Sequence, residues 1–156
     1  MRIAMYQPDM PPSVGAMIRL CACFGLPLDI IEPCGFPMSD RALRRVAMDY
    51  LKLAEIHRHR SWPSFLAAPR PGRLILLSTA GAISHLDCRF EAGDTLLLGR
   101  ESVGAPREVH EAADAVIAIP LAPGRRSLNI VVAAAIVLAE AMRQTDLFPR
   151  RDGAEP

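Results

Sequence analysis

The chain has 156 residues, of which 51% are hydrophobic, and a formal net charge of +1. A chain of this length fits one domain and can bury about 70% of its unfolded surface, so it needs no disulfide bonds to hold a core. The near-neutral charge argues against a protein that coats nucleic acid through bulk charge, but it permits a local basic patch. Lys52 is the only lysine, so nearly all the positive charge is arginine, whose planar guanidinium suits phosphates.

The sequence contains no sign of export or membrane insertion. No N-terminal segment combines a basic stretch with the long apolar run of a secretory signal. The longest wholly apolar run, residues 130–139, is much shorter than the roughly 20 residues that a membrane-spanning helix needs. The four cysteines and four histidines show no spacing typical of a metal site. We therefore expect a cytoplasmic protein with no membrane contact and no bound metal.

Short apolar runs, each typical of a buried strand, alternate with segments that can form helices. These runs are continuously hydrophobic, which together with the alternation indicates an α/β fold with a mostly parallel sheet and helices on both faces. Ser13 is the expected cap of the first helix, and Gly25 its end. The expected strands are residues 2–6, 28–31, 54–57, 73–77, 95–98 and 115–119. The expected helices are residues 13–24, 39–49, 61–67, 106–113 and 127–144.

The last expected helix, residues 127–144, is apolar on nearly all sides. Such a helix must be covered over most of its surface. In a small domain one face can pack on the sheet while another meets a second copy of the chain, so we expect a homodimer. The alternative is a helix that is buried within a monomer.

Three glycine-containing segments follow expected strands: residues 13–19 (SVGAMIR), 99–106 (GRESVGAP) and 123–129 (PGRRSLN). In open α/β folds ligands collect at the carboxyl ends of the strands, where glycine lets the backbone approach them closely. Each segment alone is weak evidence, because an isolated glycine is more often part of an ordinary turn. Together they predict a ligand site where the three segments meet.

In this order and context the segments resemble the SPOUT class of RNA methyltransferases, and the likeness extends over about residues 1–148. It is greatest to small single-domain members that methylate the 2′-hydroxyl of the wobble cytidine or uridine, position 34, of tRNA. The resemblance implies an α/β domain with a C-terminal deep trefoil knot, followed by a flexible tail at residues 149–156. It also implies S-adenosylmethionine as cofactor, S-adenosylhomocysteine as product and tRNA as partner. The matching stretches are MYQPDMPPSVGAMIRLCACFG, IIEPCGF, RALRRVAMDYL, LLLGRESVGAP and RSLNIVVA.

Site residues follow from the resemblance by position. Ser13 stands where the family's first motif usually has an asparagine, a difference that affects the positioning of RNA or ribose more than cofactor binding. The implied catalytic residues are Arg19, Glu101, Ser127 and Asn129. The implied cofactor-binding residues are Leu77, Gly99, Ile119, Leu121 and Ser127.

The chemistry that this family performs makes modest demands on the protein. A methyl group on a sulfonium is already activated, so in-line transfer needs neither a metal nor a covalent intermediate. The protein must supply orientation and a more nucleophilic ribose oxygen. Because arginine stays protonated, we expect Arg19 to stabilise charge on the 2′-oxygen or to fix the adjacent phosphate, while another group or water takes the proton. The alternative for Arg19 is a structural ion pair on a helix.

Arginines near the expected site are candidates for contacts with RNA phosphates. Positions 41, 44 and 45 share one face of their expected helix, although a solvated surface is an equally good reading. A nucleotide-binding enzyme is disfavoured because neither G-x-G-x-x-G nor G-x-x-x-x-G-K-[ST] occurs. A catalytically weakened RNA-binding module, or 2′-O-methylation elsewhere in tRNA or rRNA, stays open. The RNA-contact candidates are Arg41, Arg44, Arg45 and Arg126.

Overall fold

The structure, a computed structural model, describes residues 1–38 and 47–150. Within these residues, seven strands and five helices follow one another along the chain, and strands β4, β5 and β6 are consecutive with no helix between them. The strands are β1 (Arg2–Tyr6), β2 (Leu28–Ile31), β3 (Ile56–His59), β4 (Leu74–Leu77), β5 (Ile83–Ser84), β6 (Thr95–Leu98) and β7 (Ala115–Ala118). The helices are α1 (Pro11–Phe24), the short 3-10 helix η1 (Met48–Lys52), α3 (Trp62–Ala67), α4 (Arg107–Ala112) and α5 (Ile130–Thr145).

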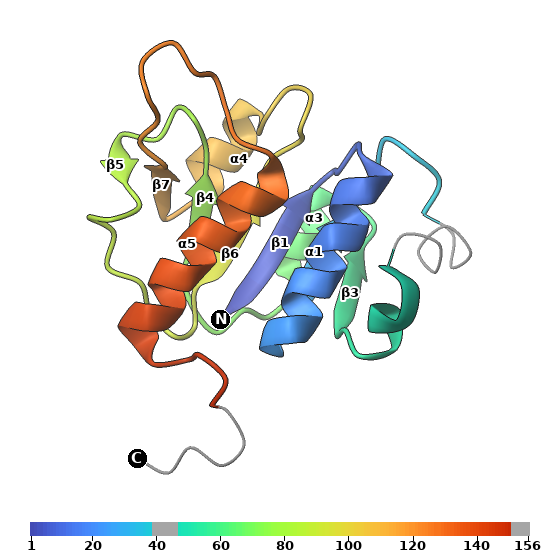
Figure 1. The fold of residues 1–156 in the computed structure, drawn as a ribbon. Helices are drawn as coiled ribbons and strands as arrows, with labels where there is room; N and C mark the ends of the chain where they lie inside the picture. The colour runs from blue at the N-terminus through green and yellow to red at the C-terminus, as the bar shows by residue number, and fades with distance from the viewer. Residues whose placement is uncertain (39–46, 151–156) are drawn as a thin grey trace.

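The strands form one sheet in the order β3-β2-β1-β6-β4-β7-β5, and each of its strand pairs is parallel. Helices α1 and α5 lie on one face of the sheet, whereas α3 and α4 lie on the other (Figure 1). The predicted α/β class, with a parallel sheet between two helical layers, is therefore confirmed. Because all the strands run the same way, their carboxyl ends share one edge of the sheet.

Burial on both faces explains the continuous hydrophobicity of the strands. In β1, Ile3 and Met5 belong to the core beneath α1 and α5. The intervening Ala4 and Tyr6 belong to a second core, which also contains Trp62 of α3. Successive side chains of a strand point to opposite faces, so a strand between two helical layers has no position for a solvated residue.

Helix α1 begins two residues earlier than expected, and Ser13 is not its cap. Met10 is the N-cap residue and makes no side-chain capping bond. Pro11 and Pro12 fit the first turn, where the missing N–H group costs no helical hydrogen bond. Ser13 is instead buried, with 7% of its surface exposed. Gly25 ends the helix in the left-handed conformation, as expected.

Three other elements differ from the prediction. Helix α5 begins at Ile130, three residues later than expected, because Asn129 caps it. The third strand runs from Ile56 to His59, two residues later than expected, because its register is set by pairing with β2. Strand β5 was not expected: it has two residues, too few for a hydrophobic pattern, and pairs with the edge of β7. Most of the expected helix at residues 39–49 lies outside the described residues.

Helix α5 is covered on one side only. Ala134, Val137 and Leu138 are buried against the sheet layer, whereas Val132 and Ile136 are 48% and 38% exposed. Along the part of the chain that the structure describes, no helix is long and apolar enough to cross a membrane. The trefoil knot and the boundary between a domain at 1–148 and a tail at 149–156 stay predictions.

Candidate active site

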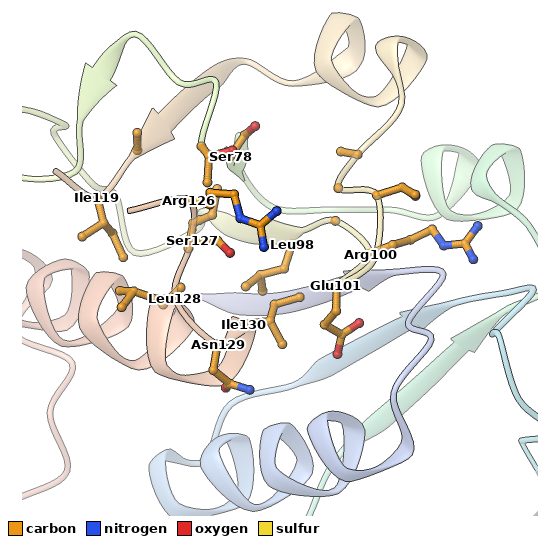
Figure 2. Close-up of a pocket in the computed structure, with 18 of the residues that line it drawn as sticks. Ser78, Leu98, Arg100, Glu101, Ile119, Arg126, Ser127, Leu128, Asn129 and Ile130 are labelled. Carbon is orange, nitrogen blue, oxygen red and sulfur yellow. The ribbon is translucent and has the colours of Figure 1, made fainter. Parts of the chain in front are cut away.

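A cavity of about 830 Å³ lies at the carboxyl edge of the sheet (Figure 2). Leu77, the last residue of β4, and Gly99, directly after β6, form part of its wall. The segment after β7 contributes Ile119 and continues around the cavity to the start of α5. Three stretches that are far apart in sequence therefore meet here, as the parallel sheet requires.

The residues predicted to bind a cofactor all lie in this wall. The volume of the cavity, about 830 Å³, falls in the range of about 300–1,000 Å³ that is usual for small-molecule sites. The predicted cofactor-binding residues found there are Leu77, Gly99, Ile119, Leu121 and Ser127.

The predicted catalytic residues divide into two groups. Glu101, Ser127 and Asn129 line the cavity. Arg19 does not: it is exposed on α1, and its guanidinium carbon lies 4.6 Å from the ring centre of Tyr50. Its Nη2 also donates to the Tyr50 hydroxyl at 3.4 Å. Within one chain, the cavity is thus assembled without this arginine.

The predicted RNA-contact residues are also divided. Arg126 lines the cavity, and Figure 2 shows its side chain reaching toward the middle of the opening. Arg41, Arg44 and Arg45 lie outside the described residues. Arg125, beside Arg126, is exposed at the cavity wall and adds positive charge.

The loop from Gly99 to Ala105 is folded back tightly on itself. Arg100 and Gly104 exchange two backbone hydrogen bonds, of 3.0 and 2.9 Å, across a turn that Gly104 closes at a φ of 74°. A Cβ atom on Gly99 would lie 2.5 Å from the nitrogen of Ala105, closer than real Cβ contacts. Glycine at position 99 therefore allows Ala105 to pack against the start of the loop, and this fold of the loop places Glu101 at the cavity.

Glu101 is held in an environment that disfavours its charge. Burial raises the pKa of Glu101, and the neighbouring Asp9 carboxylate raises it further, while the Ser13 hydroxyl opposes the change. Its Oε1 atom is buried and has no hydrogen-bond partner among the described residues. A carboxyl group with a raised pKa in a cavity wall can accept or hold a proton.

Asn129 connects the third segment to α5. Its Oδ1 accepts hydrogen bonds from the backbone nitrogens of Val131 at 2.9 Å and Val132 at 3.3 Å, which makes it the N-cap of the helix. The same side chain lies in the cavity wall. The capping oxygen thus fixes the orientation of the amide.

Several residues at or beside the cavity were not predicted from the sequence. Arg100, Ser78 and Thr79 line the cavity, and Asp9 contacts the Gly99–Ala105 loop although it is distant in sequence. Asp9 comes three residues after the end of β1, so its position after a strand was the available signal. Within residues 1–38 and 47–150, no cluster of three acidic, histidine or cysteine side chains could hold a metal ion.

Comparison with known proteins agrees with this geometry. The tRNA (cytidine(34)-2′-O)-methyltransferase of Beijerinckia indica is 52% identical over 144 residues, which are 91% of this chain and 90% of that protein. A solved structure concerned with 2-OH methylation of C/U34 on tRNA superposes with a TM-score of 0.85 at 38% identity, covering 92% of this chain and 94% of that one.

A more distant solved structure contains the cofactor. The AdoMet-bound rRNA methyltransferase of Sinorhizobium meliloti has a TM-score of 0.79 and 26% identity, with 91% of this chain matched to 55% of that one. The family model described as SpoU rRNA Methylase matches residues 1–139, which include all three segments at the carboxyl edge. The resemblance noted in the sequence is confirmed, and the chain belongs to the SpoU rRNA methylase family.

Proposed function

We propose that this chain transfers a methyl group from S-adenosylmethionine to the ribose 2′-hydroxyl of cytidine or uridine 34 of tRNA. The observation that carries the proposal is the cavity at the strand ends, which collects the second and third glycine-containing segments around Glu101, Ser127 and Asn129. The Beijerinckia indica relative is named for this reaction, and its likeness covers nearly the whole chain. A tRNA substrate also accords with a cytoplasmic location.

The cavity suits the proposed cofactor. Its volume of about 830 Å³ accommodates a ligand of nucleoside size, and Leu77, Gly99 and Ile119 offer backbone groups from three strand ends. When bound, S-adenosylmethionine supplies a methyl group that is already activated by the sulfonium charge. The S. meliloti structure, which holds AdoMet on a related fold, supports the same use of the site here.

The remaining work falls to the side chains around the cavity. Ser127 and the amide of Asn129 can orient the ribose through hydrogen bonds, and Arg126 can hold a neighbouring phosphate. Glu101 is the wall residue best suited to take the proton of the 2′-hydroxyl, because it is a carboxyl group at the cavity whose pKa is raised by burial and by Asp9.

A second copy of the chain accounts for Arg19 and for the open side of α5. Helices α1 and α5 lie next to each other on one face of the sheet (Figure 1). Val132 and Ile136 on α5 are exposed, and so is Arg19 on α1. A homodimer through this face would bury the apolar stripe, and it would allow Arg19 of one copy to serve the cavity of the other.

The function is tested by incubating the protein with methyl-labelled S-adenosylmethionine and tRNA that lacks the modification, then mapping the labelled nucleotide. Label on the ribose of nucleotide 34 is the expected result. Label at another ribose would replace the proposed substrate position. Heat of binding with S-adenosylhomocysteine but no transfer to any tRNA would support the non-catalytic RNA-binding module instead.

The dimer is tested separately by sedimentation equilibrium of the wild-type chain and of Val132→Glu. We expect a dimer for the wild type and a monomer for the variant, because a buried, unpaired carboxylate opposes association. A wild-type monomer at the concentrations used in the transfer assay would exclude a shared active site.

A further inference from the structure

We propose that Asp9 is a positioning residue, which holds the Gly99–Ala105 loop and thereby places the Glu101 carboxylate at the cavity. The inference rests on the proposed function for its catalytic consequence, but its structural part stands on contacts alone. Asp9 follows β1, whereas the loop follows β6, the strand beside β1 in the sheet. The residue therefore joins two neighbouring strand ends.

The Asp9 carboxylate accepts hydrogen bonds from the Gly99–Ala105 loop. Its Oδ1 accepts from the backbone nitrogen of Glu101 at 3.2 Å, and its Oδ2 accepts from the backbone nitrogen of Ser102 at 3.3 Å. The Ser102 hydroxyl also donates to Oδ2. The Nε of Arg100 lies 3.6 Å from the same oxygen. A single carboxylate thus accepts hydrogen bonds from Glu101 and Ser102 and forms an ion pair with Arg100.

One contact runs in the opposite direction. The backbone nitrogen of Asp9 donates to Oε2 of Glu101 at 3.5 Å, so the two residues are linked both through the loop backbone and through the Glu101 side chain. The other oxygen of Glu101, Oε1, is buried and has no hydrogen-bond partner in the described part of the chain. Asp9 therefore holds Oε2 of Glu101 and fixes the orientation of its carboxyl group.

Asp9 is itself held in place by the segment after β2. The backbone nitrogen of Gly35 donates to the oxygen of Pro8 at 2.9 Å. A Cβ atom on Gly35 would lie 2.7 Å from the Cβ atom of Asp9, so only glycine permits this approach. The side chain of Asp9 is 12% exposed. Asp9 is therefore held between two segments, with Gly35 packed against its Cβ atom and the Gly99–Ala105 loop bound to its carboxylate.

Two carboxylates this close to each other cannot both ionise readily. Burial works against the charge of Asp9, but the hydrogen bonds from Ser102 and Glu101 outweigh it and lower the pKa of Asp9 to about 2. The charge thus stays on Asp9, which has the donors, and the proton is favoured on Glu101, whose pKa is raised. Asp9 consequently affects both the position and the protonation of Glu101.

The test compares Asp9→Asn and Asp9→Ala with the matched control Asp114→Asn. Asp114 also accepts a hydrogen bond from a backbone nitrogen, that of Leu74 at 2.7 Å, but at the amino end of β4, away from the cavity. Three measurements are made on each protein: thermal unfolding, hydrogen exchange of the peptide that contains residues 99–105, and the pH profile of methyl transfer at saturating tRNA and cofactor.

We expect faster exchange in the 99–105 peptide for both Asp9 variants and unchanged exchange there for Asp114→Asn. The transfer rate of Asp9→Asn should fall by about tenfold to a hundredfold, the usual effect of losing hydrogen bonds to a charged group. The ionisation of Glu101 is identified in the pH profile of the transfer rate as the step that Glu101→Gln lacks. In Asp9→Asn this step should move to lower pH, because the neighbouring negative charge has been removed. A merely structural residue would leave that step in place.

Wild-type exchange in the loop of Asp9→Ala would overturn the anchoring role. Two outcomes would overturn the positioning role. In the first, Asp9→Asn lowers the transfer rate but leaves the Glu101 step of the pH profile unmoved. In the second, Asp114→Asn loses as much transfer rate as Asp9→Asn at an equal loss of thermal stability. Hydrogen exchange does not depend on activity. If the wild-type chain transferred no methyl group while the loop still loosened in the Asp9 variants, the proposed function would fail and the anchor would stand.

Discussion

The guanidinium of Arg19 stacks over the ring of Tyr50, with 4.6 Å between the guanidinium carbon and the ring centre. Its Nη2 atom donates to the Tyr50 hydroxyl, and this hydrogen bond raises the pKa of Arg19 above its already high usual value. Among the described residues, 1–38 and 47–150, the partner of the Arg19 cation is therefore an aromatic ring instead of a carboxylate. Its charge stays available to an RNA phosphate or a developing oxyanion, whereas a role as general base is disfavoured.

The first prediction concerns the shape of this cation. Arg19→Lys retains the charge but loses the planar fork and much of the stacking on Tyr50. We expect the methyl-transfer rate to fall by about a hundredfold or more, with unchanged affinity for S-adenosylhomocysteine, because Arg19 is not in the cavity wall. Tyr50→Phe is the matched control, since it removes only the hydroxyl. An Arg19→Lys protein with full activity would remove guanidinium geometry from the mechanism.

The second prediction follows from the position of Arg19 outside its own cavity. If each active site combines Arg19 of one copy with Glu101 of the other, then Arg19→Ala and Glu101→Gln, each inactive alone, should complement each other. After unfolding and refolding together in equal amounts, half the dimers are mixed and each has one intact site, so we expect about a quarter of wild-type activity. No activity in the refolded mixture would show that both residues act within one chain.

The third prediction separates the two roles of Asn129. Asn129→Asp keeps an oxygen that can accept from Val131 and Val132, and its charge is favourable at a helix N-terminus, so the unfolding temperature should be retained or raised. Asn129→Ala removes the cap and should lower stability by about 1 kcal/mol. Both variants lose the amide donor, so both should lose transfer activity. An active Asn129→Asp protein would reduce this residue to a helix cap.

The fourth prediction concerns stability and pH at Glu101. Its pKa in the folded chain is raised above the usual 4.5, so the folded state binds more protons than the unfolded one once the pH exceeds that value. Folding stability from this group is therefore fully present below pH 4.5 and is lost as the pH rises toward the folded pKa. Glu101→Gln cannot ionise and should be more stable than the wild type at neutral pH.

The measurement is thermal unfolding of both proteins between pH 4 and pH 8. The difference in unfolding temperature between Glu101→Gln and the wild type should shrink as the pH falls. The transfer activity of Glu101→Gln should be lower than that of the wild type by about a hundredfold or more, as for loss of a proton-accepting group. Equal unfolding temperatures across the whole range would mean that Glu101 ionises as freely in the folded chain as in the unfolded one.

The predicted cofactor wall required little beyond the sequence. The resemblance implied Leu77, Gly99 and Ile119, which lie at or directly after the ends of apolar runs typical of buried strands, and parallel strands place their carboxyl ends together. The resemblance then assigned Glu101 and Ser127 to this edge, and both line the cavity. The location of these residues at one edge depends on local hydrophobicity and on strand direction, which neighbouring residues determine.

Contacts between distant segments could not be obtained in this way. Asp9 follows an expected strand, but nothing in the sequence says that β6 lies beside β1, and only that order brings Asp9 against Glu101. Ser13 was expected to cap α1, yet the preceding prolines start the helix earlier and carry the serine into the buried first turn. Arg19 was expected at the cofactor, but the direction of α1 places it over Tyr50.

The amino-acid sequence by itself determined the α/β class, the parallel sheet and the edge at which the cavity lies, because periodicity and strand ends are local properties of the chain. Tertiary structure alone decided the order of the strands, the pairing of Asp9 with the Gly99–Ala105 loop and the separation of Arg19 from the cavity of its own chain. These depend on which segments become neighbours after the hydrophobic strands are buried, a choice made by packing over the whole molecule.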